Sequence, residues 1–457
     1  MMDTSIKQIS NPDSADRIIE DLSAGPRASY VKWFIYGLVA LVIIGLIFYA
    51  KQLQQGLGVT AMRDYTTWGI YISNFVFFVA ISLVGSLISA VLKLSGAHWQ
   101  TPLTRISEMI AVSAIILASI VIIIDMGRPD RFLNVIFHAR LQSPITWDVI
   151  VIATYLVISL LLLYLPLIPD LALLRNKWEN RSDWRKRLYT RLALNWEGTK
   201  EQKKILTRSI KVLSIIIIPV AFGIHTVTSW LFATTLRPGW DSNNFGPYFV
   251  SGAFMVGAGA VITAMFFYRK SRNLEQYITD DHFDKMGKLL LLLSFVYLYF
   301  NVNEYFVPAY KMKALESGHL YDVLYGEFAL MFWTVQIVGM IIPIIVLFFK
   351  KGRKPRPMLI VSLLVIVGAW FKRFLIVVPT LSHPYIPTDR LPHNWLHYFP
   401  TVEEWFITTG TLAAAILIVI FLARIFPVIP IVETLDMRKV IRKSTLPEIG
   451  TTEQTVS

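Results

Sequence analysis

The sequence contains no cysteine. Disulfides, thiolate-bound iron–sulfur clusters and a cysteine nucleophile are therefore excluded, so any metal–sulfur redox centre must belong to a partner. Histidine is also scarce within the apolar segments, because only His225 of the eight histidines lies well inside one. A haem held by two histidines from facing helices therefore lacks its ligand pair, and a haem–copper centre is disfavoured for the same reason. We expect no haem, metal or iron–sulfur cluster in this chain.

Charged residues are also few, at 16% of the chain, whereas 54% of the residues are hydrophobic. With a mean hydropathy of +0.53, this composition is typical of an integral membrane protein. The net charge of +13 is explained by basic loops on the inner side of a membrane and does not indicate nucleic acid. Residues 1–30 are polar, so we expect no cleaved signal peptide.

Apolar runs long enough to span a bilayer, roughly 20 residues each, recur along the chain. They predict an all-α membrane domain of about ten transmembrane helices over residues 31–430. The predicted spans are 32–50, 68–93, 104–125, 145–169, 206–232, 246–268, 285–308, 327–350, 357–380 and 402–425.

Lysine and arginine set the expected orientation, because they accumulate in cytoplasmic loops. The fourth loop, between residues 170 and 205, and the eighth, between residues 350 and 356, are strongly basic. Both are therefore predicted to face the cytoplasm, together with an N-terminal tail, 1–30, and a C-terminal tail, 431–457. No loop can hold a soluble domain, so loops and helix ends must form any partner-binding surface.

Polar side chains lie within several predicted spans, where they are costly and usually functional. Counting residues from the span ends places six of them in the outer third of the membrane. A quinone head group needs such a layer, since its two oxygens require hydrogen bonds and its oxidation requires a base. The alternative is that Arg373 forms a buried ion pair with Glu304 or Asp125 that only locks helices together. The six residues are Asn74, Asp125, Asp148, His225, Glu304 and Arg373.

Nearer the inner side, Ser86, Ser89 and Glu108 are candidates for a proton path, although serines at helix contacts more often serve packing. Lys372, beside Arg373, is expected to snorkel toward the membrane surface or to pack between helices.

Several motifs resemble those of the NrfD/PsrC-like quinone-interacting membrane subunits. The most specific are Asp125-Met-Gly-Arg-Pro129 and Ser143-Pro-Ile-Thr-Trp-Asp148. The late residues Trp370 and Arg373 resemble the alternative complex III branch of the family, with its ActC-type subunit, more closely than other branches. Weaker matches are Trp68-Gly-Ile-Tyr-Ile-Ser-Asn-Phe75, His225-Thr-Val-Thr-Ser-Trp230, Pro238-Gly-Trp240 and Gly246-Pro-Tyr-Phe249.

The resemblance implies a fold of two four-helix bundles, at about 68–232 and 246–380, plus two peripheral helices. It implies a subunit of the bacterial or archaeal cytoplasmic membrane that binds menaquinol or another quinone near the extracytoplasmic face. The implied partners are an iron–sulfur or molybdopterin-type subunit, a multi-haem cytochrome and other membrane subunits. Asp125 and His225 are then the candidate catalytic groups and also contact the quinone. Asn74, Arg128, Glu304 and Arg373 are expected to help bind it, and Arg128 is also expected to hold Asp125 ionised.

Two positions depart from the family pattern. Close relatives carry a histidine and an aspartate where this chain has Leu83 and Leu231, and an isobutyl group can neither bind a quinone oxygen nor relay a proton. A structural or proton-conducting membrane subunit without its own quinone chemistry is therefore the main alternative. A secondary transporter is a weaker one, because the spans are not interrupted by Gly or Pro in matching positions.

Overall fold

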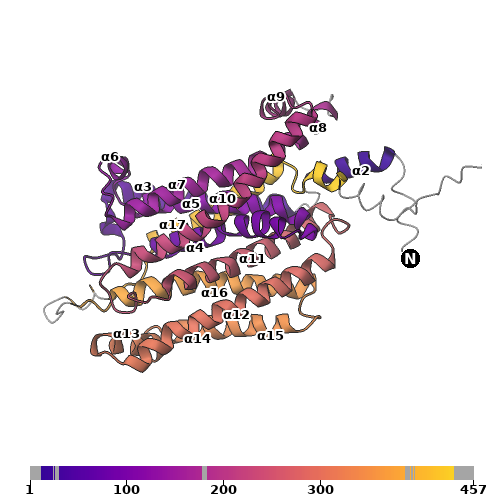
Figure 1. The fold of residues 1–457 in the computed structure, drawn as a ribbon. Helices are drawn as coiled ribbons and strands as arrows, with labels where there is room; N and C mark the ends of the chain where they lie inside the picture. Colours follow the sequence, from indigo (N-terminus) through magenta and orange to yellow (C-terminus); the bar gives the residue numbers. More distant parts are fainter. Residues whose placement is uncertain are drawn as a thin grey trace, which may run out of the picture.

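The computed structural model describes residues 12–23, 25, 30–177, 183–385, 392, 395 and 397–436. Within these ranges the chain forms helices and no β-strand, and nine helical segments are long and apolar enough to cross a membrane. The protein is thus an all-α integral membrane protein, and its long helices run side by side (Figure 1). A helix satisfies its own backbone hydrogen bonds, which is why this architecture suits hydrocarbon.

The nine segments follow the predicted spans closely. They are α3 (Tyr30–Gln55), α5 (Thr101–Asp125), α7 (Pro144–Tyr164) continued by α8 (Leu167–Lys177), α10 (Lys200–Ala233), α11 (Phe245–Arg272), α12 (Asp280–Lys311), α14 (Ala329–Gln336) continued through η6 (Ile337–Ile341) into α15 (Ile342–Phe348), α16 (Pro355–Leu381) and α17 (Val402–Ile425).

The predicted span at 68–93 differs, because it is interrupted and is not one of the nine. It consists of α4 (Ile70–Ser82), with only 13 residues, and the π-helix η3 (Ser86–Leu92). Leu83 lies in a turn between them, where its N–H donates to the carbonyl of Ala80, three residues back, at 3.3 Å. The hydrogen-bond register therefore changes within this segment, a feature that often accompanies functional sites.

Helices α3 and α17, predicted to be peripheral, pack along each other. A Cβ atom added to Gly45 of α3 would lie 3.0 Å from the Cα atom of Gly410 in α17, so the two backbones approach closely. Phe48 and Phe406 stack with ring centroids 4.8 Å apart, and Lys51 pairs with Glu403 at 2.6 Å. Small residues permit such close contact between membrane helices. The division of the other helices into two four-helix bundles stays a prediction.

The two ends of the bundle differ in their short elements. At one end lie α6 (Asn134–Phe137) and α13 (Ala314–Leu324), and at the other lie α2 (Pro12–Ser23), α8 and α9 (Asp183–Leu192) (Figure 1). The yellow C-terminal stretch lies near α2, so both ends of the described chain occupy the end that carries the basic helix α9. Residues 437–457 of the predicted C-terminal tail lie outside the described residues.

Helix α2 lies within the segment expected to be an N-terminal tail. Its side chains Ile18, Ile19 and Leu22 are buried, because they recur on one face of the helix. Asp21 accepts a hydrogen bond from Gln276 at 3.0 Å. The apolar stripe is short, so the sequence does not predict a membrane span at this helix.

Helix α11 approaches α4 and η3 closely at Gly257. A Cβ atom there would lie 2.8 Å from the Cβ of Val84 and 3.3 Å from its Cα. Gly257→Ala should therefore lower the unfolding free energy by about 1–3 kcal/mol, the usual cost of overpacking. Thermal unfolding in detergent measures this loss. Gly37→Ala is the matched control, since no atom lies within 4 Å of its added methyl. Equal stability of the two variants would contradict the packing described.

Candidate functional site

The motif that begins with Asp125 forms the turn that ends α5. Asp125 is the last residue of the helix, and Gly127 follows with φ of +67°. A side chain is strained in that conformation, and a Cβ at Gly127 would also lie 2.6 Å from Leu57. Pro129 then opens the short 3₁₀ turn η5 (Pro129–Arg131). The glycine and proline of the motif therefore fix the point at which Asp125 leaves its helix.

Asp125 faces a group of buried polar side chains from α3, α4 and α17. Tyr71 donates through its hydroxyl to Oε1 of Gln52 at 2.7 Å, and Gln52 donates to the carbonyl of Ile124 at 3.0 Å. Asp125 and Glu404 are close enough to interact electrostatically, and Tyr71 is near enough to interact with both. The Oδ1 atom of Asp125 is buried and has no hydrogen-bond partner among the described residues. Such an atom is costly unless a ligand or water satisfies it.

Glu404 anchors this group to the loop before α17. It is fully buried and accepts from the Tyr398 hydroxyl at 2.5 Å and from the backbone N–H of Ala61 at 2.9 Å. The Tyr398 hydroxyl in turn accepts from the N–H of Ile70 at 2.9 Å. Burial, assisted by the charge of Glu404, raises the pKa of Tyr398 well above its usual value, so this phenol stays a donor. The Tyr398 ring also explains why residue 69 is a glycine, because a Cβ atom there would lie 2.2 Å from that ring.

His225 belongs to a separate group. It lies eight residues before Ala233, the end of α10, which is about 12 Å along the helix axis. Its Nε2 atom is buried without a hydrogen-bond partner among the described residues. Arg373 of α16 is close enough to interact with it electrostatically. No hydrogen bond or ion pair within the described part of the chain joins His225 to Asp125.

Arg373 and Asn74 both lie near Trp370 of α16. Arg373 donates to the carbonyl of Ala369 at 3.1 Å, and a Cβ added to Gly252 of α11 would lie 3.2 Å from its Nη2 atom. Asn74 accepts from the Trp370 indole at 3.3 Å and donates to Thr411 at 2.8 Å. Both residues are buried. Asn74 thus ties α4 to α16 and α17.

The second specific motif also ends on a buried carboxylate. Pro144 occupies the first turn of α7, where its missing N–H costs nothing, and the Trp147 indole donates to the carbonyl of Leu141 at 2.5 Å. Asp148 accepts from the Thr228 hydroxyl of α10 at 2.6 Å. This contact lies one turn beyond His225 and aligns α7 with α10.

Glu304 and Lys372 form a further group between α12 and α16. Glu304 accepts from Ser242 at 2.9 Å, and Lys372 donates to the Tyr305 hydroxyl at 2.5 Å. Lys372 is 1% exposed, and its ammonium lies 4.4 Å from the Tyr305 ring centroid and 5.5 Å from that of Phe332. It does not snorkel, because aromatic faces enclose the charge. The buried ion pair of Arg373 with Glu304 or Asp125, the alternative considered from the sequence, is not formed among these three described residues.

A cavity of about 30 Å³ opens beside Glu304 and is lined by Tyr305, Glu316 and His319 among others. Burial, together with the nearby His383, lowers the pKa of His319 to about 4, so this imidazole is neutral near pH 7. The cavity is large enough for a water molecule and lies between the short helix α13 and Glu304.

Of the residues predicted to form a proton path, Ser89 and Glu108 lie in contact. Ser89 of η3 donates to Oε1 of Glu108 in α5, while Oε2 of Glu108 is buried without a partner among the described residues. The side chain of Ser86 lies outside the described residues. A proton path through these groups stays a prediction.

The expected pairing of Arg128 with Asp125 is not formed. Arg128 instead makes two hydrogen bonds of 3.1 Å to Asp130, and its side chain is 63% exposed. The turn at Gly127 carries the chain away from the end of α5, so sequence proximity did not translate into contact.

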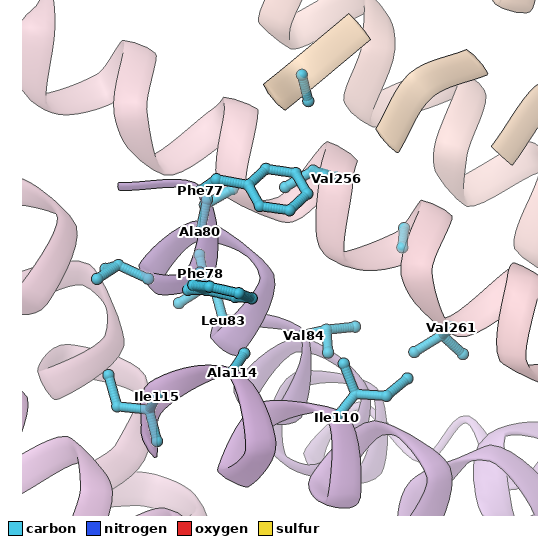
Figure 2. Close-up of a cluster of buried hydrophobic side chains, with 14 of the residues drawn as sticks. Phe77, Phe78, Ala80, Leu83, Val84, Ile110, Ala114, Ile115, Val256 and Val261 are labelled. Carbon is cyan, nitrogen blue, oxygen red and sulfur yellow. The ribbon is translucent and has the colours of Figure 1, made fainter. Parts of the chain in front are cut away.

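The side chain of Leu83 lies in a wholly apolar environment. Figure 2 shows it among Phe78, Val84 and Ala114, where α4, α5 and α11 meet. A Cβ on Gly85 would lie 2.7 Å from the Cβ of Ala111, which shows how tightly this region is packed. The position has become a packing site, and it offers no polar contact to a ligand.

Three of the polar residues near the site were missed by sequence reasoning. Gln52 lies in the last turn of an exposed apolar helix, Glu404 occupies the third position of α17, and Tyr398 is in a loop. The only available signal was the capping box of Thr401 and Glu404, which predicts a helix start rather than a buried carboxylate.

Comparison with known proteins identifies one family and several relatives that cover most of the chain. The family described as "Polysulphide reductase, NrfD" matches residues 58–383. A subunit of the selenate reductase of Mesobacillus selenatarsenatis is 23% identical over 87% of this chain and 94% of its own length. The Hdr-like menaquinol oxidoreductase integral membrane subunit of Archaeoglobus fulgidus is 22% identical over 88% of this chain and 94% of its own. The menaquinone reductase integral membrane subunit of Nitratidesulfovibrio vulgaris is 23% identical, with the same two coverages.

These relatives are subunits of reductase or menaquinol oxidoreductase complexes by their names, and two are named as integral membrane subunits. The expected family resemblance is therefore confirmed, while the special closeness to the ActC-type subunit stays a prediction. Within the described ranges, no three His, Asp or Glu side chains are grouped to hold a metal ion.

Proposed function

Since the chain belongs to the NrfD family of polysulphide reductase membrane subunits, we propose that it binds a quinone, with menaquinone the expected type, near the extracytoplasmic face of an oxidoreductase complex. One observation supports this most directly. The two candidate catalytic residues each hold a buried polar atom without a partner among the described residues, Oδ1 of Asp125 and Nε2 of His225. Native proteins rarely leave such atoms unpaired, so each is available to a ligand or water.

Asp125 is the proposed base. Oxidation of a quinol releases two electrons and two protons, so a ring hydroxyl must lie within about 2.6–3.2 Å of an acceptor. Asp125 occupies the end of α5, where an accepted proton has a short way to water. Tyr71, held by Gln52, is placed to orient the ring beside this carboxylate. The electrons pass to an adjacent iron–sulfur or molybdopterin-type subunit.

His225 is the proposed second polar contact. It lies deeper in its helix than Asp125, and Arg373 is near enough to influence it. Asn74, Glu304 and Arg373 help to bind the quinone or to orient its ring in this proposal, and their hydrogen bonds to other side chains and backbone hold them in place. Arg128 lies in the turn after Asp125 and pairs with Asp130, and both side chains are exposed.

A second function is favoured by a specific observation. Leu83 occupies an apolar cluster at a position where the resemblance implies a histidine, while Glu108 and Ser89 are joined by a hydrogen bond nearer the inner side. A protein that conducts protons or only supports the complex is compatible with both features. The complex should then retain assembly but need no quinone in this chain.

Quinone content separates the two functions. The complex is purified in mild detergent with its partner subunits, and quinone is extracted and quantified. We expect about one quinone per chain, and a substantially lower content in Asp125→Asn and His225→Ala. Asp130→Asn is the matched control, because this carboxylate is 60% exposed. A wild-type complex that holds no quinone and takes up none on addition would favour the second function.

A further inference from the structure

A pocket of about 290 Å³ lies at the end of the bundle opposite to Asp125. It is bounded by the last residues of α11 and α17, by α8 and α9, and by Ser23 and Gly25 near α2. This volume is close to the lower limit of small-molecule sites, about 300 Å³. The pocket is separate from every group described above.

The charge of this pocket is strongly positive. Arg185, Arg272 and Arg424 line it, and no Asp or Glu is among its described lining residues. The positive charges of Arg272 and Arg424 are close enough to repel each other. Three guanidinium groups around one cavity are the usual means of binding a phosphate, because each presents planar donors to its oxygens.

Arg272 is held in place by the protein. It is 6% exposed, donates through Nη2 to the carbonyl of Ala423 and lies 5.7 Å from the Tyr268 ring centroid. Tyr189 of α9 also lines the pocket and donates to the carbonyl of Ile425 at 2.6 Å. The pocket is therefore built by fixed backbone and side-chain contacts, and Arg424 and Arg185 are more exposed at its rim.

The position of the pocket indicates which kind of ligand it binds. Arg272 is the last residue of α11 and Arg424 lies in the last turn of α17, so the pocket is level with the ends of two spanning helices. Helix α9 beside it is basic and exposes 52% of Trp184, a residue type that favours membrane interfaces. Basic pockets between helix ends at this level bind the head groups of anionic lipids.

We propose that Arg185, Arg272 and Arg424 bind the phosphate of an anionic phospholipid head group at the basic end of the bundle. The phosphate oxygens accept from the three guanidinium groups, while the acyl chains lie along the apolar helices outside the pocket. The site does not depend on quinone binding, because it lies at the opposite end of the molecule.

Native mass spectrometry of the detergent-solubilised protein tests the proposal with three probes: phosphatidylglycerol, phosphatidylcholine and inorganic phosphate. We expect phosphatidylglycerol to bind more tightly than phosphatidylcholine. Arg185→Gln/Arg424→Gln should weaken its binding by about tenfold or more, the size expected when charge-assisted hydrogen bonds are lost. Lys350→Gln/Lys351→Gln is the control, since it removes two charges from exposed positions in another loop.

If the double variant does not fold, Arg424→Gln alone is used, because this side chain is exposed. Unchanged phosphatidylglycerol binding in the arginine variant, or an equal loss in the lysine control, overturns the site. Arginine-dependent binding of inorganic phosphate without binding of phosphatidylglycerol would assign the pocket to a soluble anion and overturn the lipid proposal.

Discussion

Quinol-dependent turnover should fall by about 10²-fold or more when Asp125 is replaced by Asn, the usual size of a general-base contribution. The substitution keeps the shape of the side chain and removes the proton acceptor. Because Oδ1 makes no hydrogen bond among the described residues, little structural support is lost with the charge. Steady-state turnover of the assembled complex, driven by a menaquinol analogue, is the measurement.

Two further variants serve as a control and as a second test of the quinone site. Asp130→Asn removes a nearby carboxylate that is exposed, and its turnover should match the wild type. His225→Ala should lower turnover as well if the imidazole contacts the ring. If the complex assembles and both Asp125→Asn and His225→Ala keep full turnover, this chain does not carry the quinone chemistry, and the proton-conducting or structural function replaces it.

The largest stability effect is expected at the buried pair of Arg105 and Asp170. The pair is 2.6 Å long and both side chains are 1% exposed. Asp170 also accepts from the N–H groups of Ile431 and Val432 at 3.1 and 2.9 Å, which attaches the C-terminal stretch to α8. Asp170→Ala leaves the guanidinium buried without its carboxylate, so the unfolding free energy should drop by about 3–5 kcal/mol.

Thermal unfolding in detergent and hydrogen exchange at Ile431 and Val432 measure this effect. Exchange at these two amides should accelerate in Asp170→Ala, because their acceptor is removed. Asp130→Ala breaks an exposed pair and should change stability by no more than about 1 kcal/mol. A similar small change in Asp170→Ala would mean that the buried pair contributes little to the fold.

The spanning helices could be predicted well because each depends on a local run of apolar residues. The interruption at Leu83 could not be predicted in this way, since the segment 68–93 is mainly apolar on both sides of it. It results from packing, with Gly85 against Ala111 and Gly257 against Val84. Helix α2 was missed for the opposite reason, because it buries only a short apolar stripe.

The candidate site was predictable only in part. Counting residues along helices identified polar side chains within the spans, and Asp125 and His225 each hold a buried atom without a partner among the described residues. Their partners depend on which helices are neighbours, and that information is not local. The predicted contact of Arg128 with Asp125 was wrong, because the positive φ of Gly127 turns the chain and Arg128 pairs with Asp130 instead. Of the two roles expected for Lys372, the structure shows packing between helices, and the aromatic side chains that enclose it belong to α12 and α14.

Photo-crosslinking with a reactive menaquinone analogue in the purified complex tests the central claim most directly. We expect the label to reach peptides containing Tyr71 or Asp125, excess menaquinone to compete with it, and Asp125→Asn to reduce it. Label confined to other subunits, or labelling of this chain that menaquinone does not reduce, would contradict a quinone site in this protein.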